Sequence, residues 1–187
     1  MAGIGHMEFC IEFHIPTVLN FLSQQRPVTI NFPGDINIPL IINDDADLAA
    51  AVGASGVHLG RTDPPIQQTR EQLGPRAIIG VSCYNDLARA IAAAQAGADY
   101  VAFGRFFPSN TKPNALQAEA TLLHHARRQL DLPIVAIGGI TPGNGPSLLD
   151  AGANLLAAIH GIFGQPDIQA AAAQYAELFR RIKNQHS

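Results

Sequence analysis

The sequence predicts an α/β domain, and three observations lead to this prediction. From residue 38 onward, short apolar runs alternate with alanine-rich amphipathic stretches, which is typical of strands separated by helices. The apolar runs are continuous rather than alternating, as in parallel strands that helices cover on both faces. A Gly-Ala pair joins a helical stretch to an apolar run three times, at 53–56, 97–100 and 152–155, and this weak repeat indicates close helix–strand packing.

Six strands and six helices follow from these patterns. The apolar runs predict strands at residues 38–42, 56–59, 77–81, 99–103, 133–137 and 154–159. The amphipathic stretches predict helices at residues 45–52, 65–73, 86–96, 116–130, 146–151 and 168–183. No G-x-G-x-x-G pattern follows the first of these strands, so a dinucleotide-binding open sheet is disfavoured. The series therefore favours a TIM (β/α)8 barrel.

The N-terminal part is too short for two regular strand–helix units. Barrels of this kind usually take ~250 residues, and the missing units would have to come from residues 1–37. Strands are expected at 8–15 and 27–32 with a helix at 17–25, but residues 33–37 cannot hold a second helix. We therefore expect a barrel that is incomplete or irregular over its first two units. Residues 1–37 then form an atypical N-terminal segment, and residues 38–187 form the barrel.

Composition excludes several classes of protein. Of the 187 residues, 47% are hydrophobic and 14% are charged, which is unlike a disordered chain. The net charge of −3 offers no basic field for a nucleic-acid partner. No apolar run reaches the length of a membrane span and no leader pattern opens the chain, so we expect a soluble cytoplasmic protein without a membrane contact.

Cys10 and Cys83 are too few for a disulfide framework and are expected to be buried thiols. The sequence leaves open whether the chain forms a homo-oligomer.

Two acidic residues follow neighbouring strands. Function in such barrels gathers at the carboxyl ends of the strands, and Asp44 and Asp63 follow the first and second apolar runs. Mg²⁺ prefers one or two carboxylates together with water and phosphate oxygens. The alternative is helix capping, which we expect for Asp45. The sequence therefore predicts a magnesium site formed by Asp44 and Asp63.

Glycines and strand ends on the other side of the barrel indicate phosphate binding. Gly139 is the second of two glycines after the run at 133–137, and Ile159 and His160 end the last run. Backbone N–H groups at these strand ends commonly bind phosphate, and glycine lets the backbone approach the anion. A tight turn would explain one of the two glycines but not easily both.

Other polar residues carry a weaker signal. Lys112 comes close after Ser109 and Thr111, so a cation lies beside two hydroxyls that suit a phosphoryl group, although a solvated loop would look similar. His58 lies inside a predicted strand, where packing in the core is expected. Arg105 suits either an anion or a neighbouring carboxylate.

Six segments are more specific than a generic barrel pattern. They are LIINDDADLA (40–49), GVHLGRTD (56–63), IIGVSC (78–83), GADYVAFGRFFPSNTKP (97–113), PIVAIGGIT (133–141) and AAIHGIF (157–163). In order, from about Pro39 to Phe163, they resemble the thiamine phosphate synthase family of (β/α)8 enzymes. That family joins 4-amino-2-methyl-5-hydroxymethylpyrimidine diphosphate to a thiazole phosphate, giving thiamine monophosphate and pyrophosphate. The resemblance implies two phosphorylated small-molecule substrates and a dissociative reaction, in which pyrophosphate leaves the pyrimidine methylene and the thiazole nitrogen captures the carbocation.

The resemblance also implies roles for individual residues. Asp44 and Asp63 would coordinate Mg²⁺, which is the implied cofactor. Asn43 and Lys112 would hold the diphosphate, Ser82 would contact the pyrimidine substrate, and these three are the implied catalytic residues. The thiazole phosphate would be held by Ser109, Asn110, Thr111, Gly139 and the amides of Ile159 and His160.

The sequence departs from the family upstream of the barrel. Family members carry Gln-x-Arg-x-Lys on the second strand, whereas Arg26 is the only arginine or lysine of residues 1–37. Two alternatives therefore stay open. One is a non-catalytic or weakly active phosphate-binding remnant of the family. The other is a thiazole tautomerase, which carries a histidine where this chain has Arg105; Asp44 and Asp63 argue against it, because proton transfer on the thiazole needs no diphosphate-bound metal.

Overall fold

A curved sheet of six parallel strands forms the centre of the molecule. The computed structural model describes residues 29–32, 36–108 and 117–185. The strands pair in the same order as they occur in the sequence, each with the next along the chain. They are β3 (Ile41–Asn43), β4 (Gly56–Leu59), β5 (Ile78–Tyr84), β6 (Tyr100–Phe103), β7 (Ile134–Ile137) and β8 (Leu155–Ala157).

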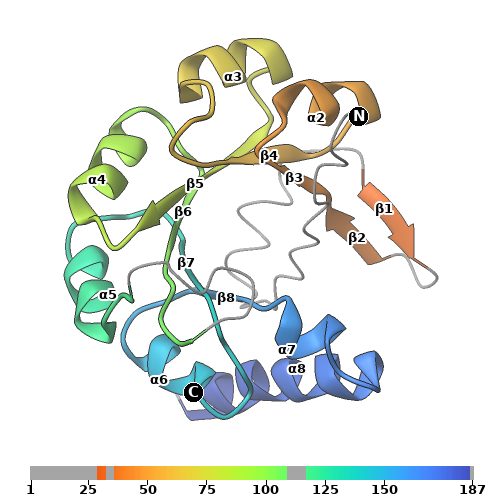
Figure 1. The fold of residues 1–187 in the computed structure, drawn as a ribbon, viewed down its shortest axis with the longest axis vertical. Coiled ribbons are helices and arrows are strands. Elements are labelled where there is room, and N and C mark those ends of the chain that lie inside the picture. The colour runs from red at the N-terminus through yellow and green to blue at the C-terminus, as the bar shows by residue number, and fades with distance from the viewer. Residues whose placement is uncertain (1–28, 33–35, 109–116, 186–187) are drawn as a thin grey trace.

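Helices cover the convex side of this sheet in an arc (Figure 1). They are α2 (Ala46–Val52), α3 (Ile66–Leu73), α4 (Leu87–Gln95), α5 (Ala120–Arg127), α6 (Gly145–Asp150), α7 (His160–Phe163) and α8 (Ile168–Gln185). The carboxylates of Asp45 and Asp86 cap α2 and α4, accepting from the backbone N–H of Leu48 at 2.8 Å and of Arg89 at 3.0 Å. The capping role expected for Asp45 is thus confirmed. Among the described residues, no helix has both the length and the apolar character needed to cross a bilayer.

The strand–helix order from β4 onward is confirmed, with ends that shift by a few residues. The predicted strand at 38–42 is wrong as a single element, because it divides at Leu40 between two strands. Leu40 donates to the Ser55 hydroxyl at 3.1 Å, and its carbonyl accepts from the backbone N–H of Ser55 at 2.8 Å. The short helix α7 was not predicted, because its four residues span a single helical turn, too short for a periodic pattern.

Over the described residues the barrel is incomplete, as expected. β1 (Thr29–Phe32) and β2 (Ile36–Pro39) pair antiparallel with each other as a separate two-stranded sheet. This hairpin lies at the open side of the curved sheet, between β3 and the end that carries α7 and α8 (Figure 1). The strand predicted at 27–32 is therefore present over the described residues, but it does not continue the parallel sheet. The elements expected at 8–15 and 17–25 lie outside the described residues.

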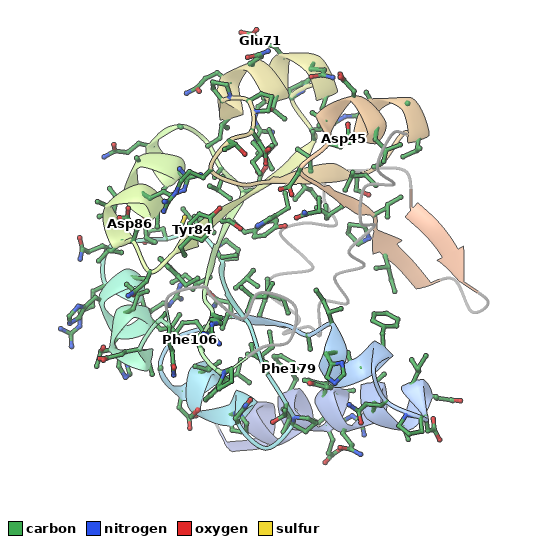
Figure 2. All side chains as sticks on the ribbon, in the orientation of Figure 1. Asp45, Glu71, Tyr84, Asp86, Phe106 and Phe179 are labelled. Atoms are coloured by element: carbon green, nitrogen blue, oxygen red, sulfur yellow. The ribbon has the colours of Figure 1, made fainter. Side chains whose placement is uncertain are left out.

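The two faces of the sheet carry different side chains. Residues that alternate along each strand pack on the inner face as a small cluster: Ile78, Tyr100, Ala102, Val135, Leu155 and Ala157. Their neighbours along the strands face the helices and form the larger core, which Phe179 of α8 joins, whereas Glu71 on α3 points away from it (Figure 2). Because side chains alternate along a strand, the inner face also receives the polar residues near the strand ends.

An arginine ties together the amino-terminal ends of two strands. Arg70 on α3 donates to the carbonyl oxygens of Ala77 at 2.7 Å and of Gly97 at 2.8 Å, and it pairs with the carboxylate of Asp99 at 2.8 Å. Asp99 also accepts from the backbone N–H of Ile79 at 2.7 Å. This cluster therefore lies at the amino-terminal edge of the sheet, opposite to the carboxyl ends of the strands.

Cys83 provides a test of the core. Its side chain is fully buried on β5, and burial raises the pKa of the Cys83 thiol from 9.0 to about 12, against a smaller lowering by Arg89. In a Cys10→Ser background, we expect no reaction with a thiol reagent at pH 8 until the protein is unfolded. One equivalent of rapid reaction in the native protein would contradict this burial.

The same thiol predicts a loss of stability at alkaline pH. The unfolded thiol loses its proton near pH 9 while the native thiol keeps it to about pH 12, so the free energy of unfolding falls as the pH rises above about 9. Well above pH 9 the slope for one proton approaches ~1.4 kcal/mol per pH unit, and about that much stability in total is lost by pH 10. Urea unfolding between pH 8 and pH 10 measures it, and the Cys10→Ser/Cys83→Ala variant is the control in which this contribution is removed.

Candidate functional site

A cavity of about 300 Å³ opens at the carboxyl ends of the parallel strands. Each strand of the sheet from β3 to β8 contributes to its wall, directly or through the loop that follows it. The residues that line it include Asn43, His58, Ser82, Tyr84, Arg105, Gly139, Thr141, Ile159 and His160. The sequence predicted five of these positions as site residues: Asn43, Ser82, Gly139, Ile159 and His160.

The two predicted metal ligands converge in front of Gly60. A Cβ at residue 60 would lie 3.2 Å from Asp63 Oδ2 and 3.4 Å from Asp44 Oδ1. The two carboxylate oxygens are therefore no farther apart than the sum of these distances. Because glycine has no Cβ, a recess stays open between the two carboxylates, which is the space that a small hard cation requires.

Backbone and side-chain bonds orient both carboxylates. The backbone N–H of Gly60 donates to Asp63 Oδ2 at 2.5 Å, and Asn43 Nδ2 donates to Asp44 Oδ2 at 2.7 Å. Asp44 has a φ of 62°, in the left-handed region that aspartate tolerates better than most residues, and its N–H donates to the His58 carbonyl at 2.8 Å. Within the described ranges, no three residues among His, Cys, Asp and Glu gather to hold a metal, so the site offers two carboxylates.

Ser82 belongs to a chain of hydrogen bonds on the inner face of the sheet. Its hydroxyl lies 2.8 Å from His58 Nε2, and His58 Nδ1 lies 3.0 Å from the hydroxyl of Tyr100. The rings of His58 and Tyr100 stack, with centroids 5.5 Å apart. The ring of Tyr100 occupies the space that a side chain at Gly80 would fill. Packing thus fixes the imidazole, and the imidazole fixes the Ser82 hydroxyl at the cavity wall.

Tyr84 connects the cavity with the recess. Its ring lines the cavity, and its hydroxyl lies 3.6 Å from the position of a Cβ at Gly60. Tyr84 has a φ of 56°, which is uncommon for an aromatic residue, and the pairing of β5 with β6 shifts register between Ser82 and Tyr84. The guanidinium of Arg61 lies 4.7 Å from the Tyr84 ring centroid (Figure 2 labels this tyrosine at the end of β5).

The opposite wall of the cavity is made of backbone. Gly138 and Gly139 have φ values of 98° and 65°, and a side chain at Gly139 would collide with the carbonyl of Pro108. The following loop is held from α8, because the hydroxyl of Tyr175 donates to the Ile140 carbonyl at 2.8 Å. Burial raises the pKa of this tyrosine above 10.0. Both positions have a positive φ and little room for a side chain, so the structure explains why both residues are glycine.

Four predicted residues cannot be placed. Ser109, Asn110, Thr111 and Lys112 lie outside the described residues. The other seven gather at one end of the sheet: Asp44 and Asp63 at the recess, and Asn43, Ser82, Gly139, Ile159 and His160 around the cavity.

Sequence reasoning did not assign His58, Tyr84 or Thr141 to the site, although all three line the cavity. His58 was expected in the core, but it faces the cavity, and Tyr84 was not considered. The alternation of side chains along the strand could have identified His58. Residues 58 and 60 fall on the same face, and residue 60 lies at the strand end where function was expected. Tyr84 lies beyond the predicted end of its strand at residue 81, so its direction could not be derived.

Comparison with known proteins agrees with this geometry. The model of the family described as thiamine monophosphate synthase matches residues 29–162. A thiamine-phosphate synthase from Nitrosococcus oceani is 63% identical over 141 residues, which cover 75% of this chain and 65% of that protein. One from Aromatoleum aromaticum is 45% identical over 173 residues, covering 88% of this chain and 83% of that protein.

A solved structure has a similar fold over most of the chain. Thiamine phosphate pyrophosphorylase from Pyrococcus furiosus superposes with a TM-score of 0.68 at 33% identity, over 76% of this chain and 67% of that chain. The match to the Nitrosococcus oceani protein spans slightly less than two thirds of that protein's length. With the family model matched over most of the parallel sheet and the candidate residues gathered at its carboxyl end, the chain belongs to the thiamine monophosphate synthase family.

Proposed function

We propose that this chain joins 4-amino-2-methyl-5-hydroxymethylpyrimidine diphosphate to thiazole phosphate, giving thiamine monophosphate and pyrophosphate. The observation that carries the proposal is that a carboxylate recess on β3–β4, reached through Tyr84, adjoins a cavity whose β7–β8 side is a glycine-rich backbone wall. Two phosphorylated ligands bound side by side need two such anion sites of different chemistry. The sequence similarity to synthases supports the same reaction.

The recess suits Mg²⁺, with Asp44 and Asp63 as ligands. Carboxylate oxygens are the donors that this ion prefers, and the missing side chain at Gly60 leaves it room. When bound, the ion would neutralise the charge that develops on the departing pyrophosphate. The chain's own contribution is orientation: Asn43 and the backbone of Gly60 hold the two carboxylates before any ligand arrives.

Asn43 and Ser82 would bind the pyrimidine diphosphate. The amide of Asn43 uses one N–H for Asp44, so a second N–H remains for a diphosphate oxygen. The Ser82 hydroxyl, positioned by His58, would contact the pyrimidine. Lys112, to which the family resemblance gives a role at the diphosphate, would stabilise the leaving group. With these contacts the bond between the methylene carbon and the diphosphate oxygen breaks, and the electron pair leaves with pyrophosphate.

The thiazole phosphate would bind at the backbone wall. Gly139, Ile159 and His160 line this side of the cavity, and Ser109, Asn110 and Thr111 complete the site by family resemblance. This arrangement would aim the thiazole nitrogen at the methylene carbon. Ile137 and Ala157 add apolar lining between the two sites, which reduces competition from water for the carbocation.

Two further assignments belong to this proposal. Residues 1–37 form an atypical N-terminal segment and residues 38–187 the synthase-like barrel; the separation of β1 and β2 from the parallel sheet supports a division near this boundary, with β2 extending to Pro39. Small phosphorylated substrates and the absence of a basic sequence character support a cytoplasmic enzyme without a nucleic-acid partner.

A product assay tests the function. The purified chain is mixed with both substrates and Mg²⁺, and thiamine monophosphate is measured by its fluorescence after oxidation. We expect product that depends on both substrates and on Mg²⁺. Binding of both substrates by calorimetry without product would instead identify a non-catalytic remnant. Conversion of a thiazole phosphate tautomer alone would identify a tautomerase.

Asp63→Asn tests the metal assignment. The amide keeps the shape of the side chain but removes its negative charge, so we expect a loss of ~100-fold to 1000-fold in kcat or a much higher Mg²⁺ requirement. Product formation is measured as a function of Mg²⁺ concentration. An unchanged Mg²⁺ dependence would exclude Asp63 as a ligand, and the matched control is Asp45→Asn, because Asp45 caps α2.

Gly60→Ala tests the recess itself. The new methyl group would lie 3.2 Å from Asp63 Oδ2 and 3.4 Å from Asp44 Oδ1, close enough to displace a cation without a collision with backbone. We expect the Mg²⁺ concentration for half-maximal activity to rise about tenfold or more. Gly143→Ala is the control, because the nearest atom to its new methyl group would be 3.8 Å away. Equal Mg²⁺ dependence in both variants would contradict the recess.

A further inference from the structure

One arginine outside the cavity bonds to both strand ends that carry the site. Arg89, half-buried on α4, donates from Nε to the Ser82 carbonyl at 2.8 Å and from Nη2 to the Gly60 carbonyl at 2.7 Å. Its guanidinium also lies 6.0 Å from the ring centroid of Tyr84. A single rigid group thus spans the carboxyl ends of β4 and β5.

The position of Arg89 is unfavourable for the helix alone. It is the third residue of α4, and beyond the N-cap Asp86, whose carboxylate accepts from the Arg89 N–H, the first turn of that helix contains no acidic residue. A cation near a helix N-terminus is repelled by the partial positive charge of the free backbone N–H groups. The two carbonyl bonds compensate for this placement, because a planar guanidinium can donate to two acceptors at fixed separation while a lysine cannot.

Both acceptors lead directly into the candidate site. The N–H of Gly60 holds Asp63 Oδ2, and Gly60 forms the floor of the recess. The side chain of Ser82 lines the cavity and bonds to His58. A shift of either strand end would move a carboxylate or the hydroxyl relative to the other.

We infer that Arg89 is a positioning residue that fixes the distance between the Asp44–Asp63 recess and the Ser82 wall of the cavity. The inference rests on the proposed function of the recess as a metal site. Arg89 touches neither substrate nor metal in this role. It acts through the backbone of Gly60 and Ser82.

The chain contains a matched control at the other end of the sheet. Arg70 on α3 also bonds to two backbone carbonyls, those of Ala77 and Gly97, and it too is partly exposed. Its acceptors precede β5 and β6 and lie away from the cavity. Arg70 in addition pairs with Asp99, so Arg70→Gln removes at least as many bonds as Arg89→Gln without moving the site.

Direct metal binding tests the inference without relying on turnover. Mn²⁺, which accepts the same oxygen ligands, is titrated into the protein with inorganic pyrophosphate present, and free Mn²⁺ is followed by electron paramagnetic resonance. We expect Arg89→Gln to weaken Mn²⁺ binding by about 10- to 100-fold, while Arg70→Gln binds as the wild type does. Arg89→Lys should also weaken binding, because it keeps the charge but not the two fixed bonds. In kinetics, kcat should fall while KM for the thiazole phosphate stays unchanged, since β7 and β8 form that side.

Each outcome has a distinct meaning. Wild-type Mn²⁺ affinity in folded Arg89→Gln would overturn the inference, and full affinity in Arg89→Lys would show that charge alone matters and overturn it as well. An equal loss in Arg70→Gln would show a general effect on folding rather than positioning. If Arg89→Gln does not fold, Arg89→Lys decides by the same criterion. If the wild type and Asp63→Asn bind Mn²⁺ equally, the proposed metal site is contradicted. This result can be told apart from a failure of the Arg89 inference, because it does not involve any Arg89 variant.

Discussion

Parallel pairing of six consecutive strands is the constraint on which the site depends. In such a sheet all carboxyl ends meet at one edge, so residues far apart in the sequence, such as Asn43 and Ile159, line one cavity. The alternation of side chains then sends His58 and Ser82 to the inner face and leaves Val57 and Val81 to the helices. Along each strand, residues that line the cavity therefore alternate with residues that pack in the core.

The site depends on small residues as much as on charged ones. Gly60 leaves a recess between two carboxylates, Gly80 makes room for the Tyr100 ring, and Gly139 lets the loop after β7 pass the backbone of Pro108. The charged and polar groups are in turn fixed from behind, Asp63 by a backbone N–H and Ser82 by His58. Preorganisation of this kind reduces the cost of orienting groups when ligands bind.

Sequence patterns predicted much of this arrangement, and the failures have physical reasons. The run at 56–59 and the cap Asp45 depend on local chemistry, and the structure has them where they were predicted. The direction of pairing of β1 is not local, because a short apolar strand fits a parallel or an antiparallel neighbour equally well. His58 was read as a core residue, because its partners Ser82 and Tyr100 come from other strands.

The order of the strands bears on how the polypeptide is made. Each of β4 to β8 pairs with the strand synthesised just before it, and the helices α2 to α6 have only six to nine residues, too few to be stable in isolation. Each helix can therefore form only as its strand joins the growing sheet. During synthesis, the nascent chain can therefore add one strand–helix unit at a time to the sheet. Until the next strand pairs with it, the edge of the most recent strand is the surface most prone to incorrect pairing.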